Sequence, residues 1–164
     1  MSENRLVTPL ARACYRVANT LITFDRLVRS SRGRGVKMLV EGESGGVLLV
    51  RHTYGKRHWT LPGGRVRRDE PTDSAAQREL EEELSLAPAQ LEGLGSYPVT
   101  HHRRHEIVNV FLASGASAVK PNPVEIAAAR WFRWDSLPDE LDPRVGLALG
   151  LLAGRRAETA ATGR

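Results

Sequence analysis

Hydrophobic side chains recur with a helical period over the first thirty residues. They are spaced three and four positions apart with arginines between them, which predicts one amphipathic helix over residues 1–30. The members of this apolar stripe are Leu10, Cys14, Val17, Leu21, Phe24 and Val28. We expect the stripe to dock on the rest of the chain or to pair with a second copy in a homodimer. Contact with an anionic membrane surface is the third use that such a stripe allows.

From residue 36 onward the pattern changes to that of short strands. Val36–Val40 and Val47–Val50 are aliphatic runs separated by glycines, and they predict a β-hairpin. A helix is expected over Pro143–Leu152. Residues 156–164 contain no core-forming side chain larger than alanine, so they are expected to form a disordered tail. Further strands are expected to end at Leu61 and to cover 91–97, 107–112 and 130–134. These elements predict an α+β fold with a mixed β-sheet, in one domain over residues 31–155.

Composition and charge narrow the class of protein. The chain has 164 residues, of which 41% are hydrophobic, so it can bury one core. It holds no run of about eighteen apolar residues, so no transmembrane helix is expected. The single cysteine, Cys14, excludes a disulfide framework within the chain and favours a cytoplasmic location. The net charge of +5 lies entirely in residues 1–35, and the 17 basic and 17 acidic residues beyond them cancel. We therefore expect no dedicated nucleic-acid face on the domain.

An acidic run is the most informative feature of the chain. Pro71 predicts the start of a helix, with Thr72 as its N-cap residue. On that helix Glu79, Glu82 and Glu83 fall within a sector of about 100°, and Glu81 points to the other side. Three neighbouring carboxylates repel one another, and a hard divalent cation, Mg²⁺ or Mn²⁺, would offset that repulsion. The alternative is a solvated helix face, which is what most glutamate runs are.

The residues around the acidic run match a known pattern. Gly64, five residues, Glu70, seven residues and then Arg78-Glu79-Leu80-x-Glu82-Glu83-x-Ser85-Leu86 resemble the signature box of the Nudix hydrolase superfamily. Ser85 stands where that box has glycine, and we expect a cost of about 1–2 kcal/mol if the helix ends there in a left-handed conformation. The strand into Leu61-Pro62-Gly63-Gly64 and the segment 129–138 also resemble the family. The resemblance covers residues 35–138.

The resemblance implies an α/β/α sandwich that hydrolyses a nucleoside diphosphate linked to another moiety. It makes Glu79, Glu82, Glu83 and the backbone carbonyl of Gly63 ligands of Mg²⁺, with Mn²⁺ as the alternative. One of the three acids would also orient or deprotonate water. Arg78 would hold a glutamate in place through an ion pair, and Glu70 would support the loop. The alternative function is a catalytically silent Nudix-fold module that binds a nucleotide or regulates a partner.

Four further residues are candidates for the same site. Glu125 is the only acidic residue between Ile107 and Trp134, and it is the candidate for a further metal ligand or general base. A structural place in the preceding turn is its alternative. Arg51 and Tyr54, which follow an aliphatic run, are candidates for contact with a phosphate or a ribose, or else belong to a plain surface loop. Gly64 is a candidate for close backbone approach to the substrate. The expected partner is a small nucleotide, and no second motif selects which one.

Overall fold

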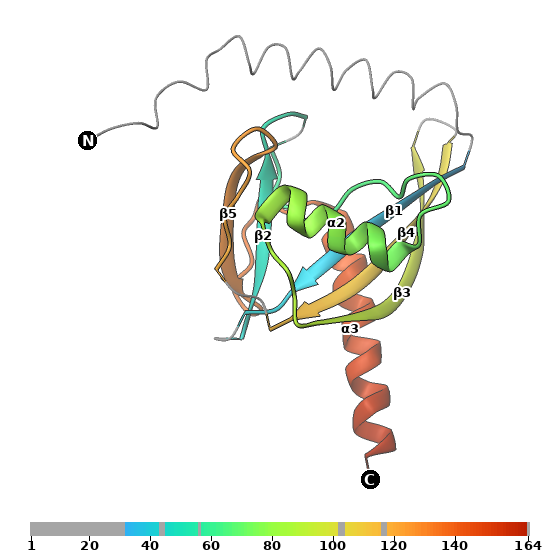
Figure 1. Cartoon of the computed structure of the whole chain (residues 1–164). Coiled ribbons are helices and arrows are strands. Elements are labelled where there is room, and N and C mark those ends of the chain that lie inside the picture. The colour runs from blue at the N-terminus through green and yellow to red at the C-terminus, as the bar shows by residue number, and fades with distance from the viewer. Residues whose placement is uncertain (1–31, 43–44, 56, 102–103, 116–117, 164) are drawn as a thin grey trace. The chain divides into compact units, whose positions relative to one another are not determined.

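The computed structural model describes residues 32–42, 45–55, 57–101, 104–115 and 118–163. The helix predicted over residues 1–30 lies outside the described residues, together with its apolar stripe and Cys14. The residues from Arg32 onward cluster as one compact unit, and its described residues are drawn in colour in Figure 1.

Within the described part of the chain, five strands form two sheets. In the first, β1 (Arg32–Val40) pairs in parallel with β4 (Arg104–Ser114), which pairs antiparallel with β3 (Gln90–His101). In the second, β2 (Gly46–His52) pairs antiparallel with β5 (Ile126–Arg133). Parallel and antiparallel pairs therefore occur together, as the predicted mixed architecture requires.

Two helices of the described residues cover opposite faces of these strands. Val36 and Met38 of β1 belong to the core under α2 (Thr72–Leu84), whereas Leu39 belongs to the core under α3 (Pro143–Thr162). Successive residues of a strand point to opposite faces, so an aliphatic run such as that of β1 is covered on both sides. Figure 1 shows α2 in front of β1 and β4, with α3 behind them. The predicted α+β sandwich of helix, sheet and helix is confirmed.

The predicted hairpin of Val36–Val40 with Val47–Val50 is wrong. β1 and β2 lie in different sheets and meet through a bridge between Glu41 and Val47. One edge of β1 is taken by β4, and the other bonds to the loop before α2, where the N–H of Val36 donates to the carbonyl oxygen of Gly64 at 2.9 Å. β1 therefore pairs with the distant strand β4 and not with β2, which follows it in the chain. Neither the hydrophobic periodicity nor the glycine spacing predicts which of the two strands pairs with β1.

The end of the chain also differs from the prediction. The structure continues α3 to Thr162, through residues that were expected to be disordered. Alanine has the highest helix propensity, so a segment without core-forming side chains can still extend a helix that is already nucleated. Arg155 pairs with Glu92 of β3, and Arg156 pairs with Glu41, each at 2.8 Å. None of the described helices is long and apolar enough to span a membrane.

Candidate active site

The helix that carries the acidic run is delimited by backbone conformation. It begins at Thr72, but Pro71 occupies the N-cap position, so the predicted side-chain cap from Thr72 is absent from this described helix. At its other end Ser85 adopts the left-handed conformation, with φ of 50° and ψ of 43°. The N–H groups of Ser85 and Leu86 donate hydrogen bonds to the carbonyls of Glu81 and Leu80, respectively. The predicted helix end without glycine is confirmed, and it carries the conformational cost of a Cβ.

Packing of α2 sets the direction of its acids. Ala76, Leu80 and Leu84 are buried against the sheets. Glu79 and Glu82 both bond to Arg78, Glu83 is buried, and Glu81 and Glu82 are exposed. Glu83 is 2% exposed, and the side chains of Glu79 and Glu82 are 12% and 44% exposed. The three carboxylates are therefore increasingly buried from the rim of the site towards the sheet.

Arg78 lies at the centre of the carboxylates. Its Nε and Nη2 atoms donate to the two oxygens of Glu70 at 2.8 and 3.0 Å. Its Nη1 atom donates to Glu79 at 2.7 Å and to Glu82 at 3.1 Å, so one guanidinium serves three acids. Hydrogen bonds from Arg78 lower the pKa of Glu70 to about 2, and the N–H of Arg67 contributes at 2.6 Å. The resemblance implied one ion pair from this arginine, and the structure shows a fork that spans the loop and the helix.

Glu83 is held by the glycine loop. Its Oε2 atom accepts from the N–H of Gly63 at 2.9 Å, and its Oε1 atom lies 3.8 Å from Nδ1 of His52. Burial raises the pKa of Glu83 to about 7, although the charge of Lys37 and the Gly63 hydrogen bond act in the opposite direction. Burial also raises the pKa of Glu79. Desolvated acids in one place mark a functional-site candidate on physical grounds.

The Gly63-Gly64 loop fits closely against both neighbours. Gly63 has a φ of +131°, and a Cβ there would lie 2.2 Å from the carbonyl oxygen of Val36. A Cβ on Gly64 would lie 2.5 Å from a carboxylate oxygen of Glu79. Gly63 therefore has to be glycine, because its Cβ would collide with the backbone of β1, whereas a Cβ on Gly64 would have to displace the carboxylate of Glu79.

The donors in this region suit a hard divalent cation. Carboxylate and carbonyl oxygens are the ligands that Mg²⁺ and Mn²⁺ prefer. Two of the carboxylates, those of Glu79 and Glu82, already meet at one cationic nitrogen of Arg78. Among the described residues no group of three His, Cys, Asp or Glu side chains is arranged as a finished metal site. The chemistry of these donors therefore fits a hard cation shared by the two acids.

Glu125 and Tyr54 interact electrostatically with the acids of α2, because the charge of Glu125 acts on Glu79 and Glu83 and the charges of all three act on Tyr54. The charge of Glu125 contributes to raising the pKa of Glu79 and of Glu83. Its carbonyl accepts from the N–H of Thr53 at 2.9 Å, just after β2. Tyr54 is 48% exposed, and its ring centroid lies 5.4 Å from that of His52. The structure thus brings both residues to the rim of the acidic site.

Arg51 lies in a different environment. Its guanidinium carbon is 4.6 Å from the centre of the Trp59 ring, and the guanidinium pairs with Glu140. The ion pair uses only the Nη2 atom of Arg51, and among the described residues no ion pair or hydrogen bond with the acids of α2 links this side chain to the site. The prediction that Arg51 contacts substrate stays a prediction.

Two residues of the site were missed in the sequence. Lys37 is the one charged side chain within the aliphatic run of β1, and that anomaly could have identified it. Asn122 donates from Nδ2 to the carbonyl of Glu82 at 3.2 Å, and its N–H donates to the carbonyl of Glu83 at 2.8 Å. It satisfies carbonyls at the end of α2 that have no partner within the helix. Its position between two prolines indicated only a turn.

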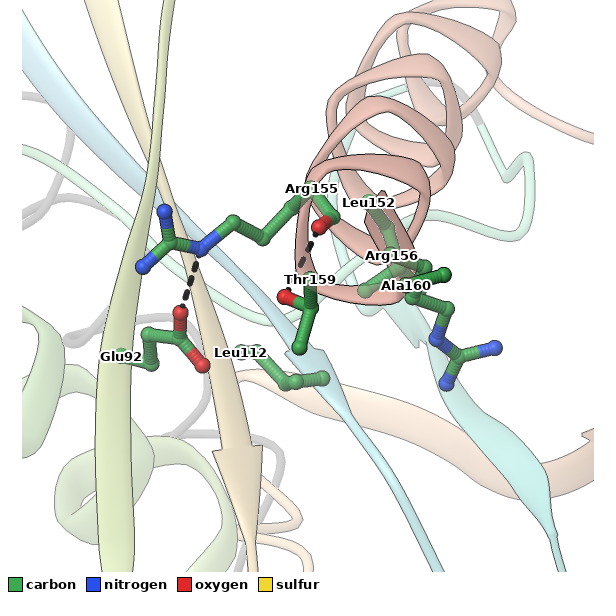
Figure 2. A pocket seen from close by; sticks show the side chains of 7 residues that line it. All are labelled: Glu92, Leu112, Leu152, Arg155, Arg156, Thr159 and Ala160. Carbon is green, nitrogen blue, oxygen red and sulfur yellow. Dashed lines mark hydrogen bonds and ion pairs between the residues drawn. The ribbon is translucent and has the colours of Figure 1, made fainter. Parts of the chain in front are cut away.

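A separate cavity lies away from the acids. Figure 2 shows it between the last turns of α3 and strands β3 and β4, where Arg155 bonds to Glu92 across one side. It is lined by Glu92, Leu112, Leu152, Arg155, Arg156, Thr159 and Ala160. None of the predicted site residues contributes to it, so it plays no part in the site on α2.

Comparison with known proteins agrees with the geometry. The model of the NUDIX domain family matches residues 31–148. An ADP-ribose pyrophosphatase of Mycobacterium tuberculosis is 34% identical over 88 residues, which are 51% of this chain and 42% of that protein. An uncharacterised Nudix hydrolase of Pseudomonas aeruginosa is 32% identical over 106 residues, 62% of this chain and 63% of that protein. The chain thus spans less than two thirds of the length of these curated relatives.

A solved structure supports the same fold. The crystal structure of a MutT NUDIX hydrolase from Burkholderia pseudomallei superposes with a TM-score of 0.67 at 28% identity. The match covers 73% of this chain and 97% of that one.

Proposed function

This chain belongs to the NUDIX domain family, and on that premise we propose that it is a Mg²⁺-dependent hydrolase of a pyrophosphate bond in a small nucleotide. The bond broken would join a nucleoside diphosphate to another moiety. The observation that carries the proposal is the gathering of Glu79, Glu82 and Glu83 on α2, next to a loop in which Gly63 has no room for a Cβ. An ADP-ribose pyrophosphatase among the relatives makes ADP-ribose a reasonable first substrate.

The chemistry requires charge to be offset at the phosphates. A pyrophosphate resists attack because its anionic oxygens repel a nucleophile, and a bound divalent ion would neutralise them and lower the pKa of coordinated water. Glu79 and Glu82 would supply carboxylate oxygens to such an ion from a rigid helix, which fixes their relative positions. Arg78 keeps the same acids in place through its hydrogen bonds. Glu125, which lies near them, would orient the attacking water or accept a proton from it.

The alternative is a module that binds a nucleotide without hydrolysing it. A module of that kind has little need to retain three acids that repel one another. The retained trio favours the enzyme.

The test is hydrolysis of a nucleotide panel by the full chain. The panel contains ADP-ribose, NADH, sugar nucleotides and 8-oxo-dGTP, and each is assayed for released phosphate-containing product with Mg²⁺ and with a chelator. We expect turnover of at least one compound, which is lost on chelation. Glu82→Gln should lower kcat on the order of 100-fold or more, because a ligand of the neutralising ion is lost. Glu81→Gln is the matched control, since it makes the same change on the exposed side of the same helix and should leave kcat unaltered.

Glu125→Gln separates the role of Glu125 from that of the helix acids. It should lower kcat while leaving the affinity for Mn²⁺ unchanged. Folded protein that hydrolyses nothing in the panel but binds one of its nucleotides would favour the silent module. Equal losses for Glu81→Gln and Glu82→Gln would refute the assignment of the helix flank.

A further inference from the structure

Lys37 occupies an unusual place for a charged side chain. It lies in the middle of β1, between Val36 and Met38, both of which are buried. Its Nζ atom donates to the carbonyl of Leu61 at 2.7 Å and to that of Gly63 at 3.2 Å. One ammonium group therefore ties β1 to two carbonyls of the loop that precedes the acidic helix.

The charges around Lys37 come from both helices. The charges of Glu83 and Glu79 on α2, and of Asp142 and Arg144 at the start of α3, influence the pKa of Lys37. Burial lowers the pKa of Lys37, and the charge of Glu83 is the largest influence that raises it. A buried ammonium is costly unless it is hydrogen-bonded and compensated by an anion. The two carbonyls and the buried Glu83 supply that compensation.

Gly63 connects the two charges. Its N–H donates to Glu83, and its carbonyl accepts from Lys37. Glu83 and the Gly63 carbonyl are also two of the donors that the resemblance assigns to a metal ion. In this structure Lys37 already bonds to the carbonyl of Gly63, and its charge acts on the carboxylate of Glu83.

We propose that Lys37 is a resident cation that takes the place of one metal ion in the inner part of the site. This inference rests on the proposed function in one respect, that the acids of α2 bind divalent ions. Lys37 is then a positioning residue: it fixes the carbonyls of Leu61 and Gly63 and balances Glu83. Divalent ions are left to the outer acids, Glu79 and Glu82.

The inference is tested by counting bound ions rather than by turnover. Mn²⁺ is titrated into nucleotide-free full-length protein, and the free ion is measured by electron paramagnetic resonance. Lys37→Met removes the ammonium from a chain of similar length, so the Gly63 carbonyl and Glu83 are exposed to the solution ions. We expect it to bind one more Mn²⁺ per chain than the wild type. Lys37→Arg keeps the charge and should keep the wild-type number. Lys120→Met makes the same change at an exposed position and should also keep it.

A second readout covers the case in which Lys37→Met folds poorly. Loss of the ammonium leaves Glu83 buried without a cation, so Mn²⁺ should raise the melting temperature of Lys37→Met more than that of the wild type. The third readout uses wild-type crystals soaked in Mn²⁺. Anomalous scattering should locate the ion at Glu79 and Glu82, with Nζ of Lys37 still bonded to Gly63.

The inference is overturned if Lys37→Met binds the same number of ions as the wild type, or if the soaked ion lies on the Gly63 carbonyl. It is equally overturned if neither protein binds Mn²⁺. Failure of the proposed function is a different result, because a chain that hydrolyses no nucleotide can still gain an ion in Lys37→Met. A purely structural role for Lys37 would lower the stability and leave the ion count unchanged.

Discussion

Glu70→Gln isolates the contribution of the Arg78 fork to stability. The wild-type carboxylate accepts two hydrogen bonds from Arg78 and one from the N–H of Arg67. Glutamine keeps the shape, removes the charge and turns an NH₂ group towards these donors. The pKa of Glu70 is about 2 in the folded chain against an ordinary 4.5, a difference that corresponds to about 3.4 kcal/mol in the absence of solvent screening. Because the pair lies at the edge of the site, we halve this to about 1.7 kcal/mol.

The pH dependence identifies the cause of the loss. A depressed folded-state pKa stabilises the protein at every pH above 4.5, and the stabilisation disappears as the pH falls towards 2. From the two pKa values of Glu70, about three quarters of it remains at pH 4 and less than half at pH 3. The difference in unfolding free energy between the wild type and Glu70→Gln should therefore be constant from pH 7 to 6 and narrow below pH 5.

The measurement is urea unfolding, followed by tryptophan fluorescence at a series of pH values for both proteins. Unchanged stability of Glu70→Gln at neutral pH would show that the fork contributes nothing net. A loss of the same size at every pH would show that shape, and not charge, is responsible. Either result would refute the reasoning.

Two other predictions follow from backbone conformation. Ser85→Gly should raise the unfolding free energy by about 0.5–1 kcal/mol, because glycine adopts the left-handed helix end without the cost of a Cβ, although it loses more entropy on folding. Calorimetry measures this change, and the activity should stay the same. A lower melting temperature of Ser85→Gly would contradict the prediction. Gly64→Ala should lower kcat at least about 10-fold, because its Cβ would lie 2.5 Å from a Glu79 oxygen and must displace a carboxylate that the mechanism needs in place. Steady-state kinetics with circular dichroism as the folding control tests this, and wild-type kcat in the alanine variant would disprove the close contact.

Local features of the site were predictable because they depend on neighbours in the chain. Residues three and four apart on a helix share a face whatever surrounds them, so the spacing of Glu79, Glu82 and Glu83 was sufficient to group them. The left-handed end at Ser85 also followed from a pattern of contiguous residues. The number of carboxylates that Arg78 binds could not be predicted in this way. It depends on the distance between the guanidinium and the loop that carries Glu70, which is set by how that loop folds back.

The sequence by itself determined the helix, its acidic flank, the glycine loop and the identity of most strands, since all of these are set by short-range sterics and periodicity. The tertiary structure alone decided that β1 pairs with β4 and not with β2. It also decided that Lys37 meets the carbonyl of Gly63 and that Glu125 lies near the acids. Such contacts join segments far apart in the chain, whose closure entropy is repaid only by the packing of the whole domain. That packing is a property of all the elements together, and no window of the sequence contains it.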